Sequence, residues 1–280
     1  MRGGSAFTAG ICKPYGVRVT SLLRYARLTG AVLTAVIAIS LTACAKMEAS
    51  LSAGEPKGPV TVFAAASLTE SFTQIGKDFE AAHPGVKVTL NFAGSSALAT
   101  QLTQGAPADL FAAASPATMK TVTDAGDADG AAVVFARNQL VIVVAKGNPK
   151  AVAGLADLAR PGLKVALCAE QVPCGSAAAK ALAAAGVRLT PVTLEQDVKA
   201  AQQKVKLGEV DAALVYRTDA RAAVADVTAV EFPESAKVVN DYSIAVLAHG
   251  PNKTAAQALL AWIQTDRGMV VLTKAGFQAP

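Results

Sequence analysis

The stretch VTVFAAASLTESF, residues 60–72, changes its pattern halfway along. Its first half, Val60 to Ala65, is a mostly apolar run of the kind that forms a buried strand. From Leu68 onward the apolar residues return at helical spacing, and Ser67 lies at the junction after three alanines. The stretch therefore predicts a strand that passes directly into a helix.

The same change from strand to helix recurs along most of the chain. Repeated strand–helix units are typical of α/β folds with mostly parallel sheets. An apolar strand at 140–145 leaves two alternatives, since it either continues the first sheet or opens a second lobe. Predicted strands cover 60–65, 86–92, 109–113, 140–145, 163–167, 212–215 and a strand-like region at 238–242. Predicted helices cover 68–83, 96–104, 116–124, 176–185, 197–207, 254–265 and 268–275.

Residues 1–43 have a different composition from the rest of the chain. They hold five basic residues and no acidic residue, and they include an apolar run from Leu28 to Leu41. A basic segment, a short apolar core and small residues before a cut site make up a secretory signal peptide. The run is shorter than a typical membrane span. We expect 1–43 to be a signal peptide, with an uncleaved signal anchor as the alternative.

The excess of basic residues lies entirely within this segment. Its five cations account for the difference between 26 Lys and Arg and 21 Asp and Glu in the whole chain. The remainder is neutral and does not interleave aromatic with basic residues, so nothing favours a nucleic-acid partner. Residues 44–59 resemble a linker in composition. About 220 residues follow, enough for one large domain or two lobes.

The sequence has no pattern that points to catalysis or to a metal site. Its two histidines, His83 and His249, precede Pro and Gly in predicted turns, and there is no G-x-S-x-G elbow. Metal-ligand and phosphate-loop patterns are missing as well. Scattered carboxylates leave an acid–base pair open. We therefore expect a binding protein without a cofactor rather than an enzyme.

Two strand–helix junctions carry the same kind of residues. FAAAS at 63–67 and FAGSS at 92–96 both place small side chains and a hydroxyl where a helix begins. Free N–H groups and the positive end of the helix dipole gather there, which suits an oxyanion. The alternative is plain helix capping, by Ser67 in a capping box with Glu70 and by Ser95 or Ser96.

Several segments together resemble the molybdate-binding proteins of ABC importers. These are FAAASL, NFAGSSALATQL, QGAPADLFAAAS with its PADLF, ALVYRTDA and the terminal KAGF. The likeness covers nearly all of residues 60–280. It implies a two-lobed periplasmic binding protein type II fold, each lobe a mostly parallel sheet flanked by helices, closing by a hinge. Lobe 1 is expected to begin with 60–139, lobe 2 to cover 140–231, and 232–280 to return to lobe 1.

The resemblance also implies a set of residues that bind the ligand. All are neutral hydrogen-bond donors, two from the first lobe and three from the second. A site made only of donors disfavours a protonated oxyanion such as hydrogen phosphate, because its O–H would find no acceptor. Such a site does not distinguish molybdate from tungstate as the ligand. Sulfate is the next alternative ligand. The implied residues are Ser67, Ser95, Cys174, Val198 and Tyr216.

The cysteines divide into two groups. The ending LTAC at 41–44 resembles the lipobox of bacterial lipoproteins, which makes Cys44 the lipidated first residue of the mature chain. Cys12 lies in the signal peptide. For the last two we hypothesise a Cys168–Cys174 disulfide that braces the ligand loop, in an exported setting. Two free buried thiols and a thiol ligand for a metal are the alternatives.

The expected protein is an exported, monomeric lipoprotein held on the outer face of the cell membrane. It captures molybdate, and also tungstate, and delivers the ion to the permease subunits of an ABC importer. Two functions of other classes are alternatives. An oxyanion sensor predicts a further domain, and a secreted hydrolase acting through Ser67 predicts a histidine and an acid beside that serine.

Overall fold

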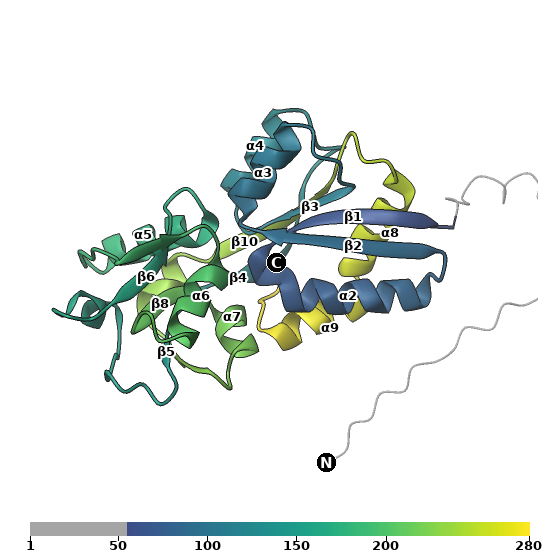
Figure 1. The fold of residues 1–280 in the computed structure, drawn as a ribbon. Coiled ribbons are helices and arrows are strands. Elements are labelled where there is room, and N and C mark those ends of the chain that lie inside the picture. The colour runs from purple at the N-terminus through teal and green to yellow at the C-terminus, as the bar shows by residue number, and fades with distance from the viewer. Residues whose placement is uncertain (1–54) are drawn as a thin grey trace, which may run out of the picture. The chain divides into compact units, whose positions relative to one another are not determined.

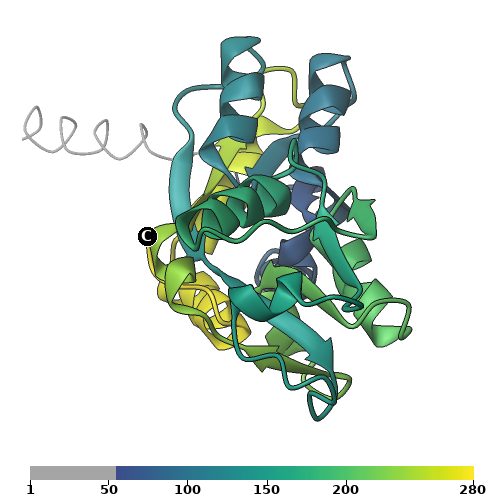
Figure 2. The same cartoon turned by 90° about the vertical axis from the view of Figure 1, so that its left-hand side faces the viewer.

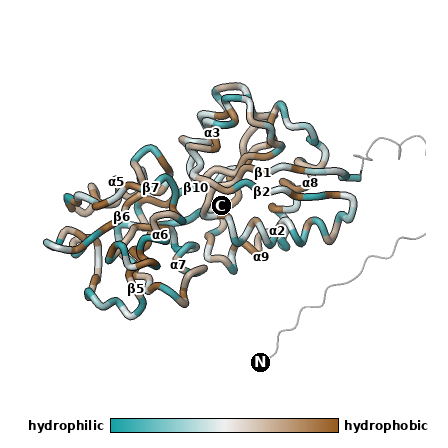
Figure 3. Tube along the Cα trace, viewed as in Figure 1, coloured by the Kyte–Doolittle hydropathy of each residue, from teal (hydrophilic) through white to brown (hydrophobic). Residues whose placement is uncertain are grey.

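The computed structural model describes residues 55–280, so the predicted signal peptide, Cys44 and most of the linker lie outside the described residues. Two five-stranded sheets form this part of the chain (Figure 1). Hydrophobic residues are concentrated along the strands and the inner sides of the helices (Figure 3). None of the helices between residues 55 and 280 is both long and apolar enough to cross a membrane.

Lobe 1 is built on the sheet with the strand order β2-β1-β3-β10-β4. All its strands run in one direction except β10, which is antiparallel to both neighbours. Side chains alternate between the faces, so Phe63 packs toward α3 and α4 while Val62 packs toward α2 and α8. The strands are β1 (Gly58–Ala65), β2 (Val86–Ala93), β3 (Leu110–Ala113), β4 (Val133–Asn138) and β10 (Asn240–Val246), and the helices are α2 (Thr69–Ala82), α3 (Ser95–Thr103), α4 (Pro116–Asp124), α8 (Lys253–Ile263) and α9 (Asp266–Ala275).

Lobe 2 is built on the sheet with the order β7-β6-β8-β5-β9, in which only β5 is reversed. Figure 1 shows α5 on one side of this sheet and α6 and α7 on the other. The strands are β5 (Leu140–Ala145), β6 (Val165–Cys168), β7 (Thr193–Glu195), β8 (Ala212–Tyr216) and β9 (Val227–Val230), and the helices are α5 (Pro173–Ala184), α6 (Val198–Lys206), α7 (Arg217–Ala222) and the 3-10 helix η2 (Leu155–Ala159).

The chain crosses between the sheets twice. It leaves lobe 1 at Gln139, between β4 and β5, and returns through the 3-10 helix η3 (Pro233–Lys237) to β10. The strand that follows each crossing is the one that runs against the rest of its sheet. The first and the last parts of the described chain therefore both belong to lobe 1, where α8 packs beside β1 and α9 beside α2 (Figures 1 and 2).

The predicted α/β class with mostly parallel sheets is confirmed, as is the two-lobed binding-protein fold. The strand at 140–145 belongs to the second sheet, so the alternative that it continues the first sheet is wrong. Besides the 3-10 helices η2 and η3, four elements were missed: β4, β7, α7 and β9. Each is short and only partly buried, so none stands out as the equally short but wholly buried strands β3 and β8 do.

Candidate oxyanion-binding site

A small cavity lies where the two lobes meet. Its volume is about 10 Å³, roughly the room that one water molecule needs by this measure, so a sugar, an amino acid or a peptide does not fit at this separation of the lobes. Five helices begin beside it: α3 and the 3-10 helix η1 (Ala66–Leu68) from lobe 1, and α5, α6 and α7 from lobe 2. Its lining consists of Ala65, Ala66, Ser67, Gly94, Ser95, Ala114, Val172, Pro173, Cys174, Asp197, Val198 and Tyr216.

The lining follows from how the strands end. Strands β1, β2 and β3 are parallel, so their carboxyl ends meet at one edge of the sheet, and small residues continue each strand there. Ala66, Gly94 and Ala114 carry little or no side chain into the space. The backbone of lobe 1 can therefore approach the opposite lobe closely.

All five residues implied by the resemblance line this one cavity. Ser67 and Ser95 come from lobe 1, while Cys174, Val198 and Tyr216 come from the starts of α5, α6 and α7 in lobe 2. Each of the five is at least 97 % buried. Their roles toward a ligand stay predictions, but the structure brings together what the sequence separates by up to 150 positions.

The alternative of a capping box formed by Ser67 and Glu70 is wrong. Ser67 lies inside η1, and neither η1 nor α2 has a side-chain cap at its start. The Ser67 Oγ atom instead lies 2.8 Å from the Tyr242 hydroxyl. Glu70 pairs with Lys199 of α6, at 2.7 Å from Nζ. A polar partner from a distant strand therefore replaces the local cap.

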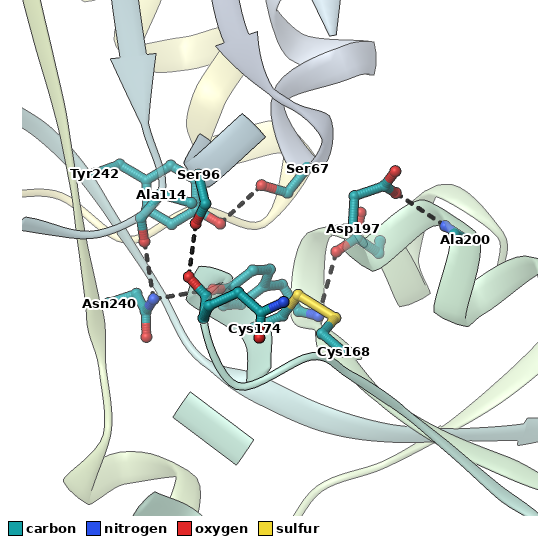
Figure 4. The surroundings of a disulfide bond; sticks show 12 residues. Ser67, Ser96, Ala114, Cys168, Cys174, Asp197, Ala200, Asn240 and Tyr242 are labelled. Atoms are coloured by element: carbon teal, nitrogen blue, oxygen red, sulfur yellow. Dashed lines mark hydrogen bonds between the residues drawn. A yellow bond between two sulfur atoms is a disulfide. The ribbon is translucent and has the colours of Figure 1, made fainter. Parts of the chain in front are cut away.

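The alternative of capping by Ser95 or Ser96 is also wrong. The N-cap position of α3 is Gly94, which offers no side chain. The Ser95 Oγ accepts a hydrogen bond from the Ala114 N–H at 3.0 Å. The Ser96 hydroxyl donates to the Gln171 carbonyl of lobe 2 at 2.6 Å (Figure 4). One serine thus faces the cavity and its neighbour ties the two lobes together.

Two backbone N–H groups complete the set of donors. Val198 and Cys174 occupy the first and second positions of α6 and α5, where N–H groups have no partner inside the helix. No hydrogen bond within residues 55–280 uses either group. The N–H of Tyr216 differs, because it donates to Asp219 Oδ2 at 3.2 Å. Tyr216 therefore has only its hydroxyl to offer.

The loop before α5 is held by a disulfide. Cys168 at the end of β6 is bonded to Cys174, with their Cα atoms 5.7 Å apart (Figure 4). In the chain-entropy model, closing so short a loop stabilises the fold by about 2 kcal/mol. Gly175 follows because the loop backbone passes against it, and a Cβ there would overlap the Ala169 carbonyl. The bond fixes the start of α5, where Cys174 lines the cavity.

Among the described residues, no lysine, arginine or histidine lines the cavity. The one lining carboxylate, Asp197, is engaged in capping α6, where its Oδ1 accepts from the Ala200 N–H at 2.9 Å. Burial raises the pKa of Tyr216 well above its ordinary value, with the charge of Asp219 adding to the effect. The hydroxyl therefore keeps its proton, and the cavity offers donors without full positive charges.

An ion-pair chain crosses from one lobe to the other beside the cavity. Lys199 Nζ lies 2.7 Å from Glu70 Oε1 in lobe 1 and 3.2 Å from Asp219 Oδ1 in lobe 2. Burial acts to lower the Lys199 pKa, but attraction to Asp219 and Glu70 outweighs it and the net pKa is raised. Burial raises the pKa of Asp219 to about 6, although Lys199 opposes the rise.

This carboxyl gives the protein a pH-dependent stability. Between pH about 4 and 6 folded Asp219 holds a proton that the unfolded chain has released, so the free energy of unfolding falls as pH rises. From the ordinary value of 3.8 to about 6, the fall is at most about 3 kcal/mol. We expect Asp219→Asn to remove it. Urea unfolding of both proteins at pH 4.5, 5.5 and 7 measures the difference, and parallel profiles would contradict the assignment.

Comparison with known proteins gives the same family at the level of sequence and of fold. The family model for bacterial extracellular solute-binding proteins matches residues 60–278. Molybdate-binding protein ModA of Mycobacterium tuberculosis is 46 % identical over 261 residues, which cover 92 % of this chain and all of that protein.

Two solved structures share the fold. The periplasmic molybdate-binding protein of Azotobacter vinelandii has a TM-score of 0.68 at 19 % identity, over 79 % of this chain and 99 % of that one. The sulfate-binding protein SubI of Mycobacterium tuberculosis also has a TM-score of 0.68, at 22 % identity over 79 % of this chain and 87 % of that one. The chain belongs to the family of bacterial extracellular solute-binding proteins.

Proposed function

We propose that the protein binds molybdate outside the cytoplasm and delivers it to the permease of an ABC importer. The observation that carries the proposal is the cavity between the lobes, whose lining residues include three that carry hydroxyls and two whose backbone N–H groups form no hydrogen bond within residues 55–280. A full-length relative, 46 % identical, is named a molybdate-binding protein. The proposed ligand residues are Ser67, Ser95, Cys174, Val198 and Tyr216.

The chemistry of these donors suits a small dianion. Each hydrogen bond to a charged group contributes about 1.5–3 kcal/mol, and helix N-termini add partial positive charge. Spreading the charge over several fixed donors removes the need for a lysine or arginine. A ligand that contacts both lobes stabilises the closed form by as much as it binds that form better than the open one.

The same donors would serve tungstate, which has nearly the size of molybdate, so we include it among the ligands. Hydrogen phosphate is disfavoured because its proton requires an acceptor. Residues 1–43 as a signal peptide, Cys44 as a lipid-bearing residue, the anchorage outside the membrane and the monomeric state belong to the same proposal.

Titration calorimetry of the purified protein with molybdate, tungstate, sulfate and phosphate tests the proposal directly. We expect molybdate and tungstate to bind, sulfate to bind more weakly because it is smaller and leaves donors at long distances, and phosphate to bind least. Tight binding of phosphate without binding of molybdate would refute the proposed function.

Removing single hydroxyls tests the site itself. Ser67→Ala and Tyr216→Phe should each weaken molybdate binding about 10- to 100-fold, the loss of one hydrogen bond to a charged group. Ser71→Ala is a matched control, since its buried hydroxyl donates to the Leu68 carbonyl at 3.1 Å and does not line the cavity. Unchanged affinity in both site variants would place the ligand elsewhere.

A further inference from the structure

The side chain of Asn240 lies at the start of β10, directly behind the cavity. Its Nδ2 atom donates two hydrogen bonds, to the Ala114 carbonyl at 2.8 Å and to the Tyr216 hydroxyl oxygen at 2.9 Å (Figure 4). Asn240 and Ala114 belong to lobe 1, whereas Tyr216 ends β8 in lobe 2. The amide therefore connects a backbone carbonyl of one lobe with a cavity hydroxyl of the other.

The Ala114 carbonyl fixes which way the amide faces. A carbonyl oxygen can only accept, so the atom opposite it must be the NH₂ group rather than the amide oxygen. The same NH₂ group reaches Tyr216, and its second hydrogen must point at the phenolic oxygen. The proton of Tyr216 is thus excluded from the direction of Asn240.

The backbone of Ala114 also orients the Ser95 hydroxyl, again as an acceptor on the side of Ala114. The Ala114 N–H can only donate, so Ser95 Oγ accepts from it at 3.0 Å and keeps its own proton free. Ala114 therefore orients one hydroxyl from each lobe, Ser95 directly through its N–H and Tyr216 through Asn240 and its carbonyl. Both hydroxyls belong to residues that line the cavity, and each already accepts one hydrogen bond.

We propose that Asn240 is a positioning residue that fixes the Tyr216 hydroxyl as a donor toward the cavity and so keeps the site selective for oxyanions without a proton. Asn240 does not line the cavity itself and acts only through Tyr216. The inference rests on the proposed function, because it assigns the polarity of a hydroxyl in that same site.

A double-mutant cycle in the full chain separates this role from a structural one. We expect Asn240→Ala to weaken molybdate binding about 5- to 10-fold when Tyr216 is present, the loss of one orienting hydrogen bond. In the Tyr216→Phe background the same change should cost less than about 2-fold, since no hydroxyl is left to orient. A residue that merely braced β10 against β3 would cost the same factor in both backgrounds.

Asn240→Asp keeps the shape of the side chain but turns the donor into an acceptor. With Tyr216 present it should draw the phenolic proton away from the cavity, and the ratio of molybdate to hydrogen phosphate affinity should fall about 10-fold or more. In the Tyr216→Phe background the ratio should not change, because the added negative charge acts on both anions. This variant also serves as the test if Asn240→Ala fails to fold.

The outcomes distinguish the two proposals. Non-additive losses with molybdate, together with a selectivity change only when Tyr216 is present, support the inference. If the wild type binds molybdate and the affinity losses of Asn240→Ala and Tyr216→Phe simply multiply in the double variant, the role of Asn240 is overturned. The proposed function then still stands. A wild-type protein that binds no molybdate overturns the proposed function, and this inference with it.

Discussion

Gly94→Ala is expected to weaken molybdate binding about 100-fold while leaving the stability of the protein nearly unchanged. Gly94 lies between β2 and α3, on the side of lobe 1 that meets lobe 2. A Cβ atom at this position would overlap the carbonyl oxygen of Gln196, which is backbone and cannot turn aside. Overpacking of this kind costs about 1–3 kcal/mol. Because the contact forms only between lobes, the cost falls on closure rather than on folding.

Titration calorimetry measures the affinity, and small-angle scattering with and without molybdate measures the closure. Gly154→Ala is the matched control, because no atom lies within 4 Å of a Cβ there and its backbone is extended, with φ −175°. The control should bind and compact as the wild type does. A Gly94→Ala protein that binds molybdate normally would show that the lobes bind the ion without approaching as closely as they do in this structure.

Two polar contacts also join the lobes and form only when the lobes are together. The Ser96 hydroxyl reaches the Gln171 carbonyl, and Lys199 reaches Glu70. Half-exposed ion pairs contribute little on their own, about 0–1 kcal/mol. The steric limit at Gly94 therefore outweighs them in deciding how close the lobes come.

Local patterns in the sequence point to only part of the site, whereas Cys174, Val198 and Tyr216 are implied by the resemblance to a known family. Ser67 and Ser95 each follow an apolar strand and precede a helix within a few residues, so the sequence pattern predicts their position at a strand–helix junction. Cys168 and Cys174 lie only six positions apart. Two elements with clear local signals, α4 at Pro116–Asp124 after a helix-starting Ser-Pro and β5 at Leu140–Ala145 as a continuous apolar run, agree with the predicted ranges.

The features of the site that local patterns do not predict depend on contacts between segments that are distant in the sequence. The capping interpretation of Ser67 failed because its hydroxyl meets Tyr242, 175 positions later, and no pattern around either residue records that pairing. Asn240 reaches Ala114 across 126 positions. Gly94 is required by the Gln196 backbone of the other lobe, whereas in the sequence it is only one more small residue in FAGSS.

Val198→Pro is expected to weaken molybdate binding about 10- to 100-fold by deleting one donor, the backbone N–H of the first residue in α6. Proline is well tolerated at this position, because its N–H is not used inside the helix and its φ suits the first turn. Asp197 before it has φ −154° and ψ 169°, the extended conformation that a following proline requires. The fold already places Pro116 and Pro173 at the first positions of α4 and α5.

Val198→Ala is the control that separates the side chain from the N–H. It removes more of the buried side chain than proline does and should be the less stable variant in urea unfolding, because truncating a buried aliphatic side chain costs about 1–3 kcal/mol. Its backbone donor is intact, so molybdate affinity should change less than about 3-fold. If proline, the variant that disturbs packing less, loses more affinity, the source is the replacement of the N–H donor by the ring methylene of proline. If both variants lose affinity equally, Val198 contributes packing at the cavity wall and the anion is held by the remaining four donors.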